Sequence, residues 1–216
     1  MAAQNLPINF AIPAEGSVAS YSFSELLSGS GYVEFYLGLN DTGMLTEFQY
    51  YSKTSLTEYS SADNNSVWTS AGSLDFKQRV NKPVSVAGKA VATIPTWKSN
   101  NSSTGVRCVV SIGKYDGVTT TILASGTTNQ NGQSTAEVYK YLTAEIDVPK
   151  TNFKIGEYLV VRVETYVATE QTTSYFKIGH DPSNQSLSDT GSSGVAWNSS
   201  TLSKSARCVI PFEVEV

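Results

Sequence analysis

The chain contains one histidine, His180, so any histidine-based chemistry must involve this residue. A Ser-His-Asp triad uses histidine as its general base, and many zinc sites use histidine and cysteine as ligands. His180 precedes Asp181 and Pro182, and therefore stands where a strand-like run gives way to a turn. This position favours a turn-stabilising or loop-packing role over a catalytic or metal-binding one.

Cysteine chemistry is limited to Cys108 and Cys208, the only two cysteines of the chain. They lie far apart in the sequence and form no Cys-x-x-Cys motif, the spacing typical of redox and zinc sites. Each falls on the apolar phase of an alternating run. We therefore expect two buried, reduced thiols rather than a disulfide.

Paired carboxylates are a further route to catalysis, because a glycosidase needs two of them across a cleft. Glu145 and Glu164 could meet across a sheet, but both lie on the outward phase of strand-like runs, where carboxylates are usually solvated. The sequence contains no Gly-x-Ser-x-Gly nucleophile motif and no glycine-rich phosphate loop. These observations predict no catalytic residues and no cofactor, and hence a protein that is not an enzyme.

Oxygen ligands for a calcium ion occur in the polar segment Asp63-Asn64-Asn65 and at Asp181. The ligand spacing of an EF-hand loop is absent from the sequence. A protein without a bound metal is therefore the favoured reading, and a calcium ion held by these oxygens is the alternative.

The charge balance argues against nucleic acid as a partner. The 216 residues carry a formal net charge of −4, and charged residues make up 16% of the chain, so no basic stripe is available for a phosphate backbone. No stretch reaches the roughly 18 apolar residues of a membrane span. The first residues lack the basic and apolar regions of a secretory signal. We expect synthesis in a cytoplasm and no membrane partner.

The elements that would position these residues are strands, because apolar and polar residues alternate with a period of two. The clearest run covers residues 106–114, and the residues on one face of it are Val106, Cys108, Val110 and Ile112. It leads into Asp116-Gly117, a strong hairpin signal because glycine adopts positive φ at no steric cost. Residues 118–124 are then expected to pair back.

Further runs follow the same alternation. Their inward faces are expected at Val33, Phe35, Leu37 and Leu39; Leu74 and Phe76; Val84, Val86, Ala90, Ala92 and Ile94; Leu159, Val161 and Val163; and Cys208, Ile210, Phe212, Val214 and Val216. Pro211 lacks an N–H group, so the last run is expected to lie at a sheet edge or to bulge there. Long polar connections are expected at 51–73, 97–105, 126–135 and 182–203, and a helical turn only at 24–27.

These runs predict an all-β protein, a single antiparallel β-sandwich of jelly-roll type with loops gathered at its two ends. Residues 16–216 would form the sandwich. Residues 1–15 carry Pro7 and Pro13 among alternating apolar residues. They would form either an arm that adds to a neighbour's sheet or the first strand of the molecule itself.

Aromatic residues in or near the expected loops and outward phases are candidates for interface or glycan contact, since tyrosine and tryptophan are enriched at interfaces and stack on sugar rings. The candidates are Tyr50, Tyr51, Trp68, Trp97, Tyr139, Tyr141 and Trp197. The alternative is that their rings pack in half-buried strands with the polar atoms in water.

The order of several segments resembles a family of viral proteins. The segments are GSGYVEFYLG, SLDFKQRVNKPVSVAGKAVATIPTW, VVSIGKYDGVTTTILASG, KIGEYLVVRVETY, KIGHDPSNQ and ARCVIPFEVEV. Their succession resembles the jelly-roll structural proteins of tailed bacteriophages and related archaeal viruses, which serve as capsid decoration, minor capsid or fibre-associated components. The resemblance spans nearly the whole chain, from about residue 20 onward.

This resemblance implies a virion location, a role in binding major capsid or other virion proteins, and no catalytic residue set. We expect a homo-oligomer that works by burying interface area. A carbohydrate-binding jelly-roll module that attaches to host surface glycans is the alternative, and a hydrolase is the third reading.

Overall fold

The computed structural model describes residues 30–40, 42–47, 49, 56–61, 65–98, 105–131, 138–169, 174–182, 197 and 204–213. Within these residues the regular secondary structure consists of strands alone. The strands are β1 (Ser30–Leu39), β2 (Gly43–Thr46), β3 (Leu56–Ser61), β4 (Asn65–Arg79), β5 (Val84–Lys98), β6 (Gly105–Tyr115), β7 (Thr120–Thr127), β8 (Val138–Phe153), β9 (Tyr158–Thr169), β10 (Ser174–Gly179) and β11 (Arg207–Glu213).

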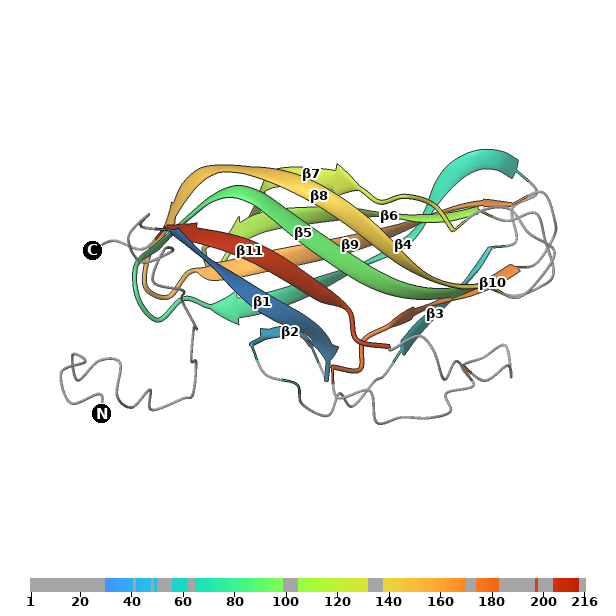
Figure 1. The fold of residues 1–216 in the computed structure, drawn as a ribbon, viewed down its shortest axis with the longest axis horizontal. Helices are drawn as coiled ribbons and strands as arrows, with labels where there is room; N and C mark the ends of the chain where they lie inside the picture. Colours follow the sequence, from blue (N-terminus) through green and yellow to red (C-terminus); the bar gives the residue numbers. More distant parts are fainter. Residues whose placement is uncertain are drawn as a thin grey trace, which may run out of the picture.

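The strands form two packed layers that run along the long axis of the molecule (Figure 1). One layer contains β8, β5, β11 and β1 side by side, and the other contains β4, β9, β6 and β7. The short strand β2 joins the two layers, because it pairs with β1 on one side and with β4 on the other. Near the end of β5, β10 pairs with that strand and carries β3 on its far side.

The predicted all-β sandwich is confirmed, with one exception to its antiparallel order. Every pairing between strands is antiparallel apart from the short one between β2 and β4, which is parallel. This exception lies where the chain passes from one layer to the other. The finer jelly-roll assignment stays a prediction.

The core lies between the layers, where the predicted inward faces meet. Val86, Ala90, Ala92 and Ile94 of β5 are fully buried, as are Cys108, Val110 and Ile112 of β6. Both cysteines are buried as free thiols, and burial raises the pKa of each to about 12. The alternation of the sequence therefore identified the correct faces of these strands, because only one face of each can reach the apolar interior.

The two layers meet closely where β7 approaches β8. Gly126 of β7 lies so near the backbone of Glu145 that a Cβ atom at this position would overlap the Glu145 carbonyl oxygen. Glycine is required here by the close approach of two backbones rather than by its own conformation.

Of two expectations about individual segments, one is confirmed and one needs correction. Strand β11 lies between β1 and β5 and is therefore no edge strand, although the register shift between Val209 and Phe212 confirms the bulge expected at Pro211. The segment 51–73 was expected to be a polar connection, yet it contains β3 and the first half of β4. Its serine and threonine side chains fit a strand that faces water on one side. A prediction based on the alternation of apolar residues does not detect such a strand.

Residues 1–15, the expected arm or first strand, lie outside the described residues, and so does the helical turn expected at 24–27. In the part of the chain that is described, no helix has the length and apolar character needed to cross a membrane.

Candidate functional site

His180 follows β10 directly and is buried in the core. Its Nε2 atom lies 3.0 Å from Thr57 Oγ1, and its ring centre lies 5.5 Å from that of Phe76. Burial lowers the pKa of His180 to about 3, so the ring is neutral at ordinary pH. These are the contacts of a packed side chain. Among the described residues, no group of three or more His, Cys, Asp or Glu side chains is arranged to hold a metal ion.

A buried ion pair lies close to His180, on the opposite face of β10. The strand register sets Lys177 opposite Glu58 of β3 and opposite Trp97 of β5, so one face of the three strands carries all three side chains. Lys177 Nζ lies 3.3 Å from Glu58 Oε2 and 4.6 Å from the centre of the Trp97 ring. Both charged side chains are almost completely covered. We call this region the β3–β10 corner.

Two of the predicted contact residues belong to the β3–β10 corner and not to the surface. Trp97 and Trp197 are each 1% exposed and pack with Leu56 in a small second core. The ring of Tyr139 packs edge-on against Trp197 at 5.6 Å between ring centres. The outward phase of β5 is thus itself covered at this end, which corrects the expectation that these two tryptophans lie in exposed positions.

Four other predicted residues remain, and two of them are described. Trp68 of β4 is half-buried on the outer face of its layer, where the Arg107 guanidinium lies 4.4 Å from its ring centre. Tyr141 of β8 is 38% exposed. Tyr50 and Tyr51 lie outside the described residues. The structure therefore does not bring the five described aromatic candidates together in one site.

The carboxylates that were considered for glycosidase chemistry are also kept apart. Glu145 lies on β8 and bonds to Lys89 Nζ at 2.7 Å, whereas Glu164 lies on β9 in the other layer and accepts a 2.9 Å hydrogen bond from Ser70 Oγ. Each points away from the core on its own layer. They do not flank a common cleft.

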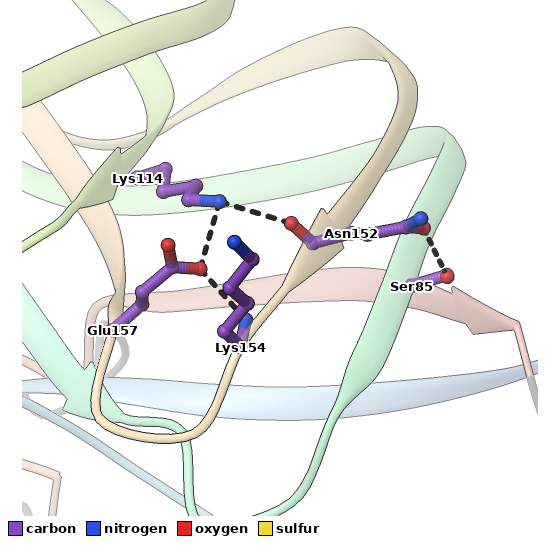
Figure 2. Close-up of polar contacts among 5 residues, drawn as sticks. All are labelled: Ser85, Lys114, Asn152, Lys154 and Glu157. Carbon is purple, nitrogen blue, oxygen red and sulfur yellow. Dashed lines mark hydrogen bonds and ion pairs between the residues drawn. The ribbon is translucent and has the colours of Figure 1, made fainter.

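The opposite end of the sandwich carries a connected polar network, shown in Figure 2. Lys114 Nζ lies 2.7 Å from Glu157 Oε2 and donates a 3.1 Å hydrogen bond to the carbonyl oxygen of Asn152. The same Glu157 oxygen accepts a 2.7 Å hydrogen bond from the backbone N–H of Lys154. Ser85 Oγ closes the network with a 2.6 Å bond to Asn152 Oδ1. These contacts tie the turn between β8 and β9 to β6 and β5.

Two turns at this end expose apolar side chains. Val118, in the turn between β6 and β7, is 88% exposed, and Ile155, in the turn between β8 and β9, is 66% exposed. Asp116 Oδ1 accepts hydrogen bonds of 2.8 Å from the N–H groups of Val118 and Thr119. Because Tyr115 pairs with Tyr158, the two turns leave neighbouring strands at the same end. We call this region the turn end.

Reasoning from sequence missed Val118 and Ile155, because it sought contact residues only among aromatic side chains. The signal was present in the sequence, since each residue is an apolar side chain within a polar turn, in Asp-Gly-Val and in Lys-Ile-Gly-Glu. Each stands out because the other residues of its turn are polar or glycine.

Comparison with known proteins gives neither a matching family model nor a matching curated protein. Solved structures do match in fold. An α-amino acid ester hydrolase aligns with a TM-score of 0.54 at 11% identity, over 83% of this chain and 36% of that one. An aminopeptidase from a marine sediment Thaumarchaeota archaeon aligns with a TM-score of 0.52 at 11% identity, over 86% and 37%.

Two further matches extend the comparison. A CocE/NonD family hydrolase from Staphylococcus aureus aligns with a TM-score of 0.50 at 12% identity, over 85% of this chain and 37% of that one. The capsid protein VP2 of infectious bursal disease virus matches more weakly, with a TM-score of 0.36 at 9% identity, over 86% and 40%. The weak match to VP2 carries no argument about this chain.

The hydrolase and peptidase matches concern fold alone, and this chain spans little more than a third of the length of those proteins. They nevertheless correct one expectation. The chain was predicted not to be an enzyme, but its fold recurs within hydrolases, so an all-β sandwich gives no reason to set an enzymatic role aside. The chain is therefore a β-sandwich whose fold is shared with parts of larger hydrolases.

Proposed function

We propose that the chain is a β-sandwich binding domain that docks on another protein through its turn end, and that the assembly it joins is a virus particle. The observation that carries the proposal is the exposure of two apolar side chains, Val118 and Ile155, on turns at one end of the molecule. Exposed apolar groups gathered on one surface are typical of binding sites.

The turns that carry these side chains are braced, which favours binding. Glu157 is held by the Lys114 ammonium and by the N–H of Lys154, and the neighbouring turn is held by the Asp116 carboxylate. Held turns lose little conformational freedom when a partner covers them, so less of the interaction energy is lost to ordering. The same ionic contacts hold the pKa of the Glu157 carboxyl below its usual range, mainly through the hydrogen bond with Lys114.

The virion setting rests on the resemblance of the sequence segments to viral jelly-roll proteins. In that setting the partners are major capsid or other virion proteins, the protein is made in the host cytoplasm, and it forms a homo-oligomer on the particle. A specific contact of this kind should bury at least about 1,000 Å² in total.

The test is a co-sedimentation assay with particles that lack the protein. We expect a double substitution, Val118→Ser with Ile155→Ser, to weaken binding to the particles at least about tenfold, because exposed apolar anchors carry much of an interface energy. Met44→Ser is the matched control, since Met44 is an exposed apolar side chain on β2, outside the two turns.

Both variants should melt at the temperature of the unsubstituted protein, because none of the three side chains is buried. Unchanged particle binding by the double variant, or an equal loss with Met44→Ser, would refute docking through the turn end. If the unsubstituted protein sediments with no particle component, the virion setting fails.

A second candidate function is supported by the matches to hydrolases. In this reading the sandwich is one part of a hydrolase and docks on the rest of that enzyme through the same turn end. Assay of the full-length native protein with aromatic esters and aminoacyl anilides tests this. Turnover that co-purifies with the chain would support the hydrolase reading, and its absence in protein that still binds particles would remove it.

A further inference from the structure

A guanidinium between two aromatic rings lies on the outer face of the layer formed by β4, β9 and β6. Arg107 lies with its Cζ atom 4.4 Å from the ring centre of Trp68 and 5.8 Å from that of Tyr166. The strand register explains the arrangement, because Arg107 of β6 stands opposite Tyr166 of β9, which stands opposite Ser70 of β4. Trp68 lies in the irregular stretch of β4 just before Thr69, and its ring reaches Arg107 on this face.

Gly105 allows Trp68 to lie flat against the strand. A Cβ atom at this position would come within 2.9 Å of Trp68 Cη2, so any larger residue would push the indole outward. The indole therefore rests on the backbone of β6 beside Arg107. This contact fixes one wall of the arrangement.

Arg107 differs from Arg162 and Arg207 in its partners. Arg162 is bonded to Asp75 through two nitrogens, and Arg207 is bonded to Glu34. Arg107 has no carboxylate within ion-pair distance among the described residues, and its Nε atom is buried without a hydrogen-bond partner. The guanidinium is therefore not paired with a carboxylate of its own sheet, and its planar shape suits the carboxylate of a ligand.

The neighbouring polar groups restrict the kind of ligand. Glu164 accepts a 2.9 Å hydrogen bond from Ser70 Oγ. Burial, and next the hydrogen bond with Glu164, raise the pKa of Tyr166. A ligand that carried many negative charges, such as an acidic peptide or a nucleic acid, would be repelled by the Glu164 carboxylate. A ligand with one carboxylate and several hydroxyl groups would meet Arg107 with the first and Glu164 and Ser70 with the second.

We propose that Trp68, Arg107, Tyr166 and Glu164 form a binding site for an acidic saccharide, a sugar that carries one carboxylate. The rings of Trp68 and Tyr166 supply apolar surface for the sugar, and Arg107 supplies the charge. This site lies on a sheet face and is separate from the turn end, so it adds to the docking function proposed above and does not depend on it.

The test is a calorimetric titration of the full chain with N-acetylneuraminic acid and with glucuronic acid, with galactose and glucose as neutral probes. We expect saturable binding of one or both acids and none of the neutral sugars at the same concentrations. Comparison of the two acids distinguishes a sialic from a uronic acid source. Tryptophan fluorescence provides a second readout, because Trp68 is half-buried whereas Trp97 and Trp197 are buried.

Two charge-matched variants identify the site. Arg107→Gln should weaken binding at least about tenfold, since it removes charge-assisted hydrogen bonds. Arg79→Gln is the control, because Arg79 is an exposed arginine at the far end of the same strand β4 as Trp68. It removes the same charge and should change binding less than about twofold.

A Trp68→Phe variant should keep binding but lose the fluorescence change, and it serves as a second probe if Arg107→Gln proves poorly folded. The proposal is overturned if neither acid binds saturably, if the neutral sugars bind equally well, or if Arg79→Gln weakens binding as much as Arg107→Gln does. If the unsubstituted protein binds an acidic sugar but does not dock on particles, that result would refute the proposed docking function and leave the sugar site in place.

Discussion

Two lysine–glutamate pairs, each beside an aromatic ring, lie at opposite ends of the sandwich and have different surroundings. At the β3–β10 corner, Lys177 lies 3.3 Å from Glu58 and 4.6 Å from the Trp97 ring centre, and the pair is almost completely covered. At the turn end, Lys114 lies 2.7 Å from Glu157 and 5.6 Å from the Phe153 ring centre. There the two charged side chains are 24% and 16% exposed.

The difference follows from what covers each pair. At the corner, Leu56 of β3 and Trp197 lie with Trp97 in a second small core. At the turn end, the pair lies beside two turns, and the apolar side chains of these turns, Val118 and Ile155, are exposed to water. A lysine–glutamate pair is therefore part of the interior at one end and stabilises exposed turns at the other. For this reason we assign docking to the turn end.

The largest expected effect is on the covered end. Trp97→Ala should lower the free energy of unfolding by about 3–5 kcal/mol, because it leaves a cavity beside a buried charge. Ile155→Ser, at the exposed end, should leave the unfolding free energy nearly unchanged. Urea unfolding followed by circular dichroism measures both. Comparable losses for the two variants would break the distinction between a covered and an exposed end.

The lysines sharpen the comparison. Lys177→Met should destabilise the protein by about 3 kcal/mol, because it removes the ammonium that faces the covered Glu58 carboxylate. Lys114→Met should cost about 1 kcal/mol or less, since that pair is partly open to solvent and is screened by it. Chemical unfolding at low and at high salt measures both losses of unfolding free energy. Only the loss caused by Lys114→Met should become smaller at high salt.

The pH dependence of stability reports on His180 at the covered end. Its pKa is lowered to about 3 in the folded protein, against 6.5 in an unfolded chain, so the unfolded state takes up the proton first as the pH falls. Stability is complete at neutral pH and is lost below about pH 6.5, by about 1.4 kcal/mol per pH unit until about pH 3.

Measured between pH 6.5 and 5, above the range in which Asp75 and Glu157 titrate, this slope should disappear in His180→Gln. A slope that persists in the variant would mean that another group is responsible.

The smallest effect is expected at the exposed turn between β6 and β7. Asp116→Ala removes the acceptor of the Val118 and Thr119 N–H groups and should loosen the turn with little change in melting temperature. Hydrogen exchange at these two amides should speed up, and particle binding should weaken less than in the double variant at Val118 and Ile155. A fall in melting temperature as large as that of Trp97→Ala would place this turn in the stable core instead.

Much of the fold could be predicted from local alternation. The inward faces of β5, β6 and β9 were correct because one face of each strand lines the main core, and a period of two identifies that face without knowledge of the partner strand. The Asp116-Gly117 turn was also predictable, and Gly117 has the positive φ of 104° that such a turn needs. The return strand expected at 118–124 is shifted, because the turn continues through Thr119 and β7 covers Thr120–Thr127.

The remainder depends on contacts between distant residues. Trp97 stands on an outward phase, and only its contacts with Leu56 and Trp197 make that phase an interior. The pairing of Lys177 with Glu58, and of Lys114 with Glu157, follows from strand order, which alternation does not encode. The candidate docking residues were missed for the opposite reason, because Val118 and Ile155 are apolar residues whose exposure appears only once the turns are placed.

The most direct test of docking through the turn end is hydrogen–deuterium exchange of the protein, free and bound to its particle. We predict that binding slows exchange in the turns at 116–119 and 154–157, while the amides of the β3–β10 corner exchange at the same rate in both states. Protection confined to other surfaces, with these two turns exchanging as fast when bound as when free, would contradict the account.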